Sequence, residues 1–397
     1  MSAMKRLFQV MADKKASDIF LSVGAPINIK INGVAVPVNQ AIMTADTVRQ
    51  LLYEILNERQ IKEFEDEMEL NTAISLEGVG SFRISAFRQK GAPAVVVRYI
   101  PNTIPGIDSL GLPEILKEVI MQKRGLILVV GATGSGKSTS LASMIDYRNE
   151  RKSGHILTLE DPVEFIFHNK KSIVNQREVG TDTKAFDIAL RNALRQAPDC
   201  ILIGEIRDKD TMSASIAYAQ SGHLCLATLH ANNSYHAMNR IINFYPLETR
   251  PSLLLDLAAA LQAVISLRLV RTKTGARMPA VEILLNTRNI SELIEKGEIS
   301  EIKEALEKSL APGSQTFEQA LFKLFMDGKI TQEEALANAD SASNMLWLIN
   351  QATAGELSLS GAATPPARPA PEEKKESALS DARGGPSFND FKIDANA

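Results

Sequence analysis

Cysteine and long apolar runs are scarce in this chain of 397 residues, and each scarcity narrows its class. The two cysteines, Cys200 and Cys225, stand inside apolar runs and form no C-x-x-C pair, which favours reduced core residues over a zinc site. No run of about 18 apolar residues occurs, so no transmembrane helix is expected. Residues 1–10 lack the apolar core of a signal peptide. These absences together favour a cytoplasmic protein.

An excess of charge is also missing. The net charge is −3, with 45% hydrophobic and 23% charged residues, an ordinary balance for a globular protein. No overall positive field attracts nucleic acid, so we expect no nucleic-acid partner and disfavour a nucleic-acid translocase. The length is sufficient for two or three domains with buried cores.

Against this background, one segment carries a specific signal. Residues 131–139, Gly-Ala-Thr-Gly-Ser-Gly-Lys-Ser-Thr, match the phosphate-loop pattern G-x-x-x-x-G-K-[ST] in full. An apolar run, 126–130, precedes the loop and a helix-compatible segment, 140–151, follows it, which is the context that the pattern requires. Lys137 can reach the β- and γ-phosphates of a nucleoside triphosphate, and the Ser138 hydroxyl can ligate Mg²⁺. The residues expected to bind the nucleotide here are Gly131, Thr133, Gly134, Ser135, Gly136, Lys137, Ser138 and Thr139.

The pattern of apolar segments predicts an α/β protein with an N-terminal α+β domain. Four apolar runs alternate with helical segments in the second domain, which indicates a mainly parallel sheet covered by helices; they are 126–130, 155–159, 200–203 and 224–229. The expected organisation is an N-terminal domain (1–100), a linker with two prolines and two glycines (101–111), an ATPase core (112–285), a helical region (286–352) and a disordered tail (353–397).

The N-terminal domain shows strand, hairpin and helix signals in turn. Asn32-Gly33 predicts a hairpin, and residues 44–64 carry helical periodicity. The strands expected here are 18–23, 26–31, 69–76, 81–87 and 94–100. In the C-terminal region, the pattern predicts a helix over 316–326 with an apolar face.

Two further strand ends carry carboxylates. The apolar run 201–203 leads into Gly-Glu-Ile-Arg-Asp, which places Glu205 near the phosphate loop, because ligand sites of open α/β sheets lie at the carboxyl ends of strands. Residues 158–164, Thr-Leu-Glu-Asp-Pro-Val-Glu, end another strand with acids that suit metal and water binding in phosphoryl transfer. A plain surface acid and a solvated acidic loop are the structural alternatives for these two segments.

Histidines bracket one strand. The chain holds five histidines, and two of them, His223 and His230, lie on either side of the run 224–229. An imidazole can donate to a γ-phosphate or respond to its loss, so both are candidates for the nucleotide site. A structural role remains the alternative for each.

These segments, taken in order, resemble a known group of motors. Residues 131–139, 158–164, 201–208 and 221–230 match the Walker A, Asp box, Walker B and His box of the secretion-type ATPases of type IV pili and type II secretion. The resemblance covers roughly residues 1–345 and is specific, because the four boxes agree in order and spacing. It implies a PAS-like N-terminal domain, a RecA-like ATPase domain and hydrolysis of ATP with Mg²⁺.

Within this group the chain resembles the pilus retraction ATPases, the PilT/PilU family. Residues 16–19, Ala-Ser-Asp-Ile, are similar to the start of that family, and the cysteine-based zinc module usual in extension and secretion motors has no counterpart here. Residues 285–290, Leu-Asn-Thr-Arg-Asn-Ile, depart from the Ala-Ile-Arg-Asn segment of PilT-like motors. That departure and the Pro/Ala-rich tail favour the PilU-like branch over the PilT-like branch.

The resemblance also implies roles for individual residues. Glu205 would be the catalytic glutamate, Glu160 and Glu164 would assist metal and water, and His230 would contact the phosphate region. Ser138 and Glu164 are the metal-ligand candidates, and His223 and Arg207 are further nucleotide-binding candidates. Arginines of the N-terminal domain would close over the nucleotide; the best matches are Arg83 and Arg98, with Arg88 third, and Arg195 and Arg207 are candidates across a subunit boundary.

The implied assembly is a homohexamer that acts on an inner-membrane pilus platform protein, in the cytoplasm at the pilus base. It would drive pilus retraction and twitching motility, alone or with a paralogous PilT-like ATPase. Two alternatives stay open: a pilus-extension or type II secretion ATPase, and an accessory nucleotide-binding partner of another pilus motor.

Overall fold

The computed structural model describes residues 2–31, 33–76, 78–100 and 103–353. Its strands form a six-stranded sheet in the N-terminal part and a seven-stranded sheet further along the chain. Apart from Thr353, the tail predicted over 353–397 lies outside the described residues, as do Asn32 of the predicted hairpin and residues 101–102 of the predicted linker. The domain boundaries given above stay a prediction.

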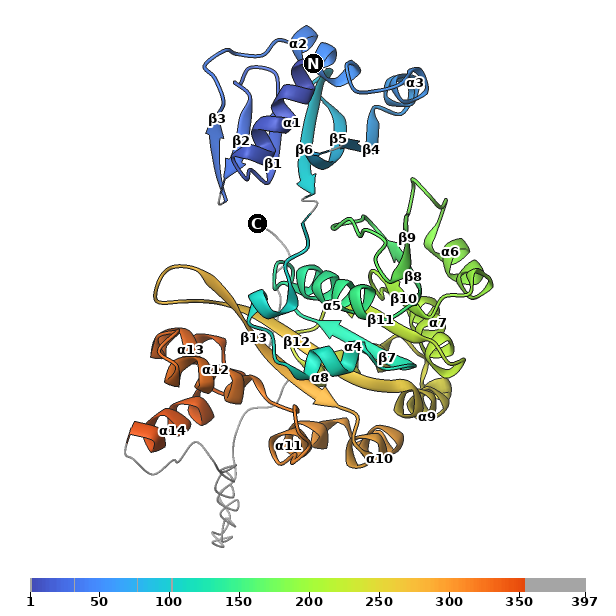
Figure 1. The fold of residues 1–397 in the computed structure, drawn as a ribbon, viewed down its shortest axis with the longest axis vertical. Coiled ribbons are helices and arrows are strands. Elements are labelled where there is room, and N and C mark those ends of the chain that lie inside the picture. Colours follow the sequence, from blue (N-terminus) through green and yellow to red (C-terminus); the bar gives the residue numbers. More distant parts are fainter. Residues whose placement is uncertain (1, 32, 77, 101–102, 354–397) are drawn as a thin grey trace, which may run out of the picture. The chain divides into compact units, whose positions relative to one another are not determined.

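The N-terminal sheet is antiparallel and has the order β3-β2-β1-β6-β5-β4. Alternation along its strands turns Ile19, Ile84 and Val97 to one face, where they pack with Phe8 and Leu52 from helices. Figure 1 draws this sheet and its helices in blue to teal. The strands are β1 (Asp18–Leu21), β2 (Asn28–Ile31), β3 (Val34–Pro37), β4 (Glu69–Leu76), β5 (Gly80–Gln89) and β6 (Ala92–Ile100), and the helices are α1 (Ala3–Asp13), α2 (Ala45–Tyr53) and α3 (Glu58–Glu67).

The single helical segment predicted over 44–64 is wrong in one respect. The structure divides it, because α2 ends at Tyr53 and α3 begins at Glu58. Asn57 causes the restart: its side chain accepts from the backbone N–H of Gln60, and the Gln60 side chain accepts from the backbone N–H of Asn57. This capping box satisfies free N–H groups at a helix start, so it ends one helix and begins another within one apolar period. Helix α1 was not predicted.

The second sheet has the order β13-β12-β7-β11-β10-β8-β9, and every pairing in it is parallel except that of β12 with β13. Its strands are β7 (Gly125–Val130), β8 (Gly154–Glu160), β9 (Ser172–Glu178), β10 (Cys200–Ile203), β11 (Leu224–Leu229), β12 (Leu261–Arg271) and β13 (Arg277–Leu285). Alternate residues of β7 enter two different cores, which shows that both faces are covered. The covering helices are α4 (Ile115–Ile120), α5 (Lys137–Arg151), α6 (Phe186–Ala193), α7 (Lys209–Gln220), α8 (Ser234–Asn243) and α9 (Arg250–Ala260).

This arrangement confirms the predicted RecA-like α/β core. It adds three strands that the sequence pattern did not predict, namely β9, β12 and the strand paired with it, β13. Strand β9 carries polar residues over half its length, and β12 follows α9 without any intervening turn residue. Neither therefore shows the usual boundary signal of a strand. The carboxyl ends of β7, β8, β10 and β11 share one edge of the sheet, where the phosphate loop lies.

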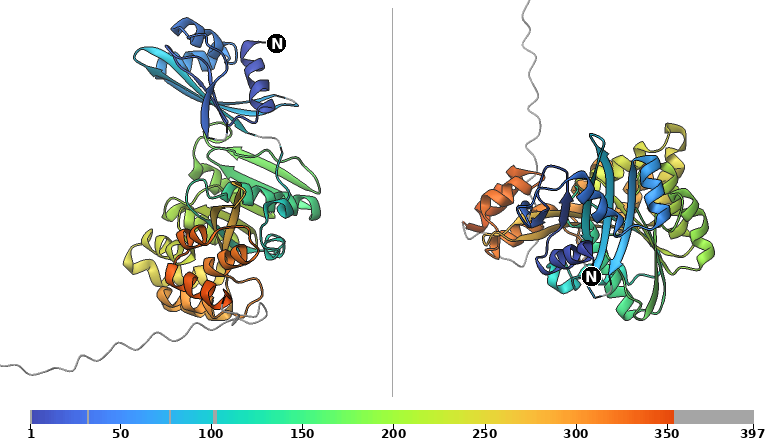
Figure 2. Two further views of the ribbon diagram at one scale, coloured as in Figure 1. Left: turned by 90° about the vertical axis from the view of Figure 1, so that its left-hand side faces the viewer. Right: turned by 90° about the horizontal axis from the view of Figure 1, so that it is seen from above.

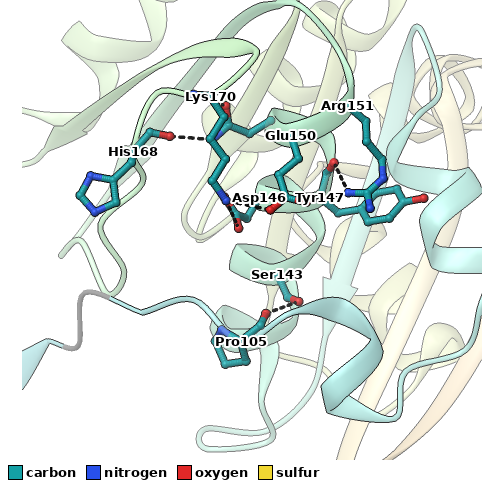
Figure 3. A network of polar contacts seen from close by, with 9 residues as sticks. Pro105, Ser143, Asp146, Tyr147, Glu150, Arg151, His168 and Lys170 are labelled. Atoms are coloured by element: carbon teal, nitrogen blue, oxygen red, sulfur yellow. Dashed lines mark hydrogen bonds and ion pairs between the residues drawn. The ribbon is translucent and has the colours of Figure 1, made fainter.

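The predicted linker is fixed to the helix that follows the phosphate loop. The Ser143 hydroxyl of α5 donates to the Pro105 carbonyl at 2.7 Å (Figure 3), and a short 3₁₀ helix, Ile107–Leu110, buries Ile107. Asp146 and Glu150 of the same helix pair with Lys170, which lies just before β9, at 2.8 Å and 3.0 Å (Figure 3). Helix α5 is therefore held from two sides outside the sheet.

Helices follow the last strand, as the sequence pattern predicts. Thr316 caps α12, whose Phe317 and Leu321 pack with Val270 of β12 and Ala280 of β13. Figure 2 draws this end of the described chain in orange and red. Arg268 of β12 joins this region to the sheet: its guanidinium lies 3.8 Å from the Phe317 ring centroid and pairs with Asp340. The helices are α10 (Arg288–Lys296), α11 (Ile302–Glu307), α12 (Phe317–Met326), α13 (Gln332–Asn338) and α14 (Ala342–Thr353).

Candidate nucleotide-binding and hydrolysis site

The phosphate loop joins β7 to α5 as the sequence pattern predicts. A Cβ on Gly131 would lie 2.7 Å from the Leu267 carbonyl oxygen and 2.3 Å from the Ser135 hydroxyl, so the loop can pack this closely only with glycine there. Gly131 and Ser135 lie buried at the base of the loop. A cavity lies at this edge of the sheet, beside the phosphate loop. The loop residues that line it are Thr133, Gly134, Gly136, Lys137, Ser138 and Thr139. Their backbone N–H groups at the start of α5 suit an anion.

Lys137 is the first residue of α5 and is 8% exposed. Its ammonium group donates to the carbonyl oxygens of Gly131 and Ala132, both at 2.9 Å. Burial lowers the pKa of Lys137, and the negative charges of Glu164 and Glu205 oppose that shift. The two carbonyl contacts hold the ammonium group in the cavity, where triphosphate oxygens can be bound.

Glu205 follows β10 at the same edge of the sheet. One carboxylate oxygen lies 2.7 Å from Nε of Arg207, and the other lies 3.3 Å from Nε2 of His230. The preceding residue, Gly204, donates its N–H to the Leu159 carbonyl at 2.8 Å, and its own carbonyl accepts from the Thr228 hydroxyl. The carboxylate is therefore fixed on both sides and sits on a backbone tied to two neighbouring strands.

The Asp-box carboxylates differ in environment. Glu160 is 8% exposed and accepts from the Thr158 hydroxyl at 2.6 Å and from Nε2 of Gln176 at 3.1 Å. Burial raises the pKa of Glu160, partly offset by these hydrogen bonds. Glu164 lines the same cavity. A solvated acidic loop therefore does not describe Glu160, which is held in the wall of the site.

Arg207 connects the two acidic segments. Besides its contact with Glu205, its Nη1 lies 3.3 Å from Asp161, and the contact with Glu205 is the main cause of a raised pKa of Arg207. Asp208 has a different task, because it caps α7 through the Thr211 backbone N–H at 2.8 Å. Arg207 lines the cavity with its charge already shared between two carboxylates.

The two candidate histidines lie at opposite edges of the sheet. His230 directly follows β11 on the phosphate-loop side and lines the cavity. His223 precedes β11, where its Nδ1 lies 3.3 Å from the Tyr218 carbonyl and its own carbonyl accepts from the Gly125 N–H at the start of β7. The expectation that both belong to one nucleotide site is therefore corrected within this chain, since the length of a strand separates them.

The candidate arginines of the N-terminal sheet fall into two classes. Arg83 and Arg98 face each other as register partners on β5 and β6. Arg88 is engaged elsewhere: it pairs with Glu65 and its guanidinium lies 5.3 Å from the Phe64 ring centroid. Arg88 therefore has a structural role in its own domain, whereas the other two share one face of the sheet.

Several lining residues were not identified from the sequence. Thr228 lies inside the apolar run of β11, and Arg277 begins β13 after a turn, so neither stands in a recognisable motif. Arg277 reaches the cavity through the pairing of β12 with β7, a long-range contact with no local signal. Arg195, proposed for a subunit boundary, lies in a short 3₁₀ helix, Leu194–Gln196.

The described residues lack two features, a cluster of metal ligands and a membrane-spanning helix. No group of three or more His, Cys, Asp or Glu side chains in this part of the chain is placed to hold a metal ion. None of its helices combines the length and apolar character needed to cross a bilayer.

Comparisons with known proteins agree with this geometry. Residues 2–292 match the family model described as type II/IV secretion system protein. The chain is 46% identical to the type IV pilus ATPase PilU of Pseudomonas aeruginosa, over 87% of this chain and 91% of that protein. It is 39% identical to the retraction ATPase PilT of the same organism, over 85% and 98%.

A crystal structure of the pilus retraction motor PilT with bound ADP superposes with a TM-score of 0.81 at 38% identity, covering 87% of this chain and 98% of that one. The ATPase DotB of Legionella pneumophila gives 0.72 at 27% identity, covering 84% and 94%. The chain belongs to the type II/IV secretion system protein family, in the group of pilus retraction ATPases that includes PilU and PilT.

Proposed function

We propose that this chain is an ATP-hydrolysing motor that powers retraction of type IV pili. The observation that carries the proposal is the fixed position of Glu205 between His230 and Arg207, in the cavity that holds Lys137. A carboxylate at that place can orient water for attack on a phosphate bound by the loop. The similarity to PilU and PilT supports the inference that the motor acts on type IV pili.

In this proposal each residue of the site has a role in ATP hydrolysis. Lys137 and the loop N–H groups bind the β- and γ-phosphates, Glu205 accepts the proton of the attacking water, and His230 holds Glu205 and responds to the γ-phosphate. Arg83 and Arg98 neutralise charge that develops on the phosphoryl oxygens. Ser138 and Glu164 would hold Mg²⁺, which supplies charge neutralisation between the phosphates when bound.

The assembly that we propose is a homohexamer in the cytoplasm at the pilus base, acting on an inner-membrane platform protein. In a ring, ATP binding and release would move each N-terminal domain against the ATPase core about the linker. The Ser143–Pro105 hydrogen bond fixes the linker to α5 from Pro105 onward. A shift of α5 after hydrolysis would then carry Pro105 with it.

Deletion of the gene in cells tests which process the motor drives. A strain that lacks the gene should retain or accumulate surface pili and show poor twitching. Loss of assembled pili would contradict retraction and support an extension or secretion motor. Complementation with Glu205→Gln separates the remaining alternative: the variant should not restore twitching if this chain's own hydrolysis drives retraction. Restored twitching would instead assign it an accessory role beside a paralogous ATPase.

A further inference from the structure

A row of charged side chains crosses the N-terminal sheet. Register pairing places Lys30, Asp18, Arg98 and Arg83 side by side on β2, β1, β6 and β5. Directly opposed residues of antiparallel strands point to the same face. That face is opposite to the one where Ile19 and its neighbours meet the helices. One carboxylate therefore lies in a row with three cations.

Asp18 is held much more tightly than an ordinary surface acid. It is 5% exposed, and one carboxylate oxygen lies 3.0 Å from Nε of Arg98. The other oxygen accepts from the Ser17 hydroxyl at 2.9 Å. Both oxygens are engaged, so the orientation of the carboxylate is fixed, and it in turn fixes the plane of the Arg98 guanidinium.

Arg98 is bound at one end only. Its side chain is 69% exposed, and the contact with Asp18 uses Nε. In the described residues no hydrogen bond or ion pair occupies its two terminal nitrogens. These two nitrogens can donate a bidentate pair of hydrogen bonds to phosphate oxygens. The contact with Asp18 thus leaves the two terminal nitrogens of Arg98 available for a ligand.

Stability alone does not account for this pair. An ion pair with so exposed a partner contributes little to stability, while a carboxylate removed from water carries a desolvation cost. The domain has another Asp–Arg pair, Asp46–Arg49, which is exposed on α2 and has no such burial. The buried geometry at Asp18 is therefore better explained by control of where Arg98 points.

We propose that Asp18 is a positioning residue that orients the Arg98 guanidinium for contact with the phosphates of ATP. The proposal rests on the function given above, in which Arg98 stabilises charge on the phosphoryl oxygens. It also gives a role to the segment Ala16-Ser17-Asp18-Ile19, since Ser17 and Asp18 act together on one arginine. Removing a positioning group should lower kcat more than it raises KM, because orientation matters most in the transition state.

The test is a double-mutant cycle on the full-length chain, with Asp18→Asn, Arg98→Ala and the double variant. Arg98→Ala should lower kcat for ATP about 100-fold or more, and Asp18→Asn about 10-fold with KM changed less than about threefold. In the Arg98→Ala background, Asp18→Asn should have no further effect. An equal loss in both backgrounds, or no loss with Asp18→Asn alone, overturns the proposal.

Further measurements separate the possible failures. Asp46→Asn, in the exposed pair, is the matched control and should leave kcat unchanged. Ser17→Ala removes one hold on the carboxylate without removing the charge; it should lower kcat about threefold, and only when Arg98 is present. It also keeps the test decisive if Asp18→Asn does not fold. If Arg98→Ala keeps full activity, the assignment of Arg98 fails, and the role of Asp18 fails with it, while the Glu205 assignment stands.

Discussion

Replacing Gly204 by alanine should slow catalysis while leaving ATP binding nearly unchanged. A Cβ there would lie 3.0 Å from the Leu159 carbonyl oxygen and 3.2 Å from the Glu160 Cα, below the 3.4–4 Å of ordinary contact. Both neighbours are backbone atoms, so neither can swing away. Gly204 is itself tied to β8 and β11, and the displacement of a few tenths of an ångström must therefore pass into Glu205.

Gly204→Ala should lower stability by about 1–3 kcal/mol, as overpacking does. It should lower kcat by roughly 10- to 100-fold, since small misplacement of a reacting group is costly, and leave ATP affinity close to wild type. The assay is steady-state ATPase with nucleotide binding by fluorescence. Gly106→Ala is the control, because its Cβ meets no atom within 4 Å. Activity within about twofold of wild type in a folded Gly204→Ala protein would refute this reasoning.

Three more changes have defined outcomes. Lys137→Ala should abolish ATP binding by calorimetry, and retained affinity would contradict the phosphate-loop contacts. Burial raises the pKa of Glu282, so the folded chain holds a proton that the unfolded chain releases, and stability falls as pH rises through the folded pKa. Thermal unfolding of Glu282→Gln should therefore improve relative to wild type as the pH rises above the ordinary pKa of a glutamate, and a constant difference would argue against ionisation of Glu282. Arg268→Met should destabilise by about 2–4 kcal/mol in urea, since it leaves Asp340 without its ion-pair partner and removes a cation–π contact with Phe317; a loss below about 1 kcal/mol would contradict it.

Much of the ATPase core follows from local patterns. The phosphate loop and the apolar strands before Glu205 and His230 are each continuous in sequence. They can therefore be predicted without knowledge of the fold. Strand direction also carries information: His223 stands before β11 and His230 after it, and in a parallel sheet only the second can reach the phosphate-loop edge. The misplacement of His223 could have been avoided by applying this rule.

Other features depend on pairing between distant segments. The contact of Asp18 with Arg98 joins strands separated by most of the N-terminal domain, and Arg277 reaches the cavity through two successive strand pairings. Neither leaves a local pattern. The break at Asn57 is different, because Asn followed by Gln60 is a readable capping box, and the apolar period through it masked the signal.

The most direct test of the account is the ATPase rate of purified Glu205→Gln beside the wild-type chain at saturating ATP. Glutamine keeps the size of the side chain and can still accept from Arg207, but it cannot accept the proton of water. The account predicts that ATP still binds and that kcat falls by about 100-fold or more. Turnover at the wild-type rate would contradict the assignment of Glu205 and the hydrolysis site built around it.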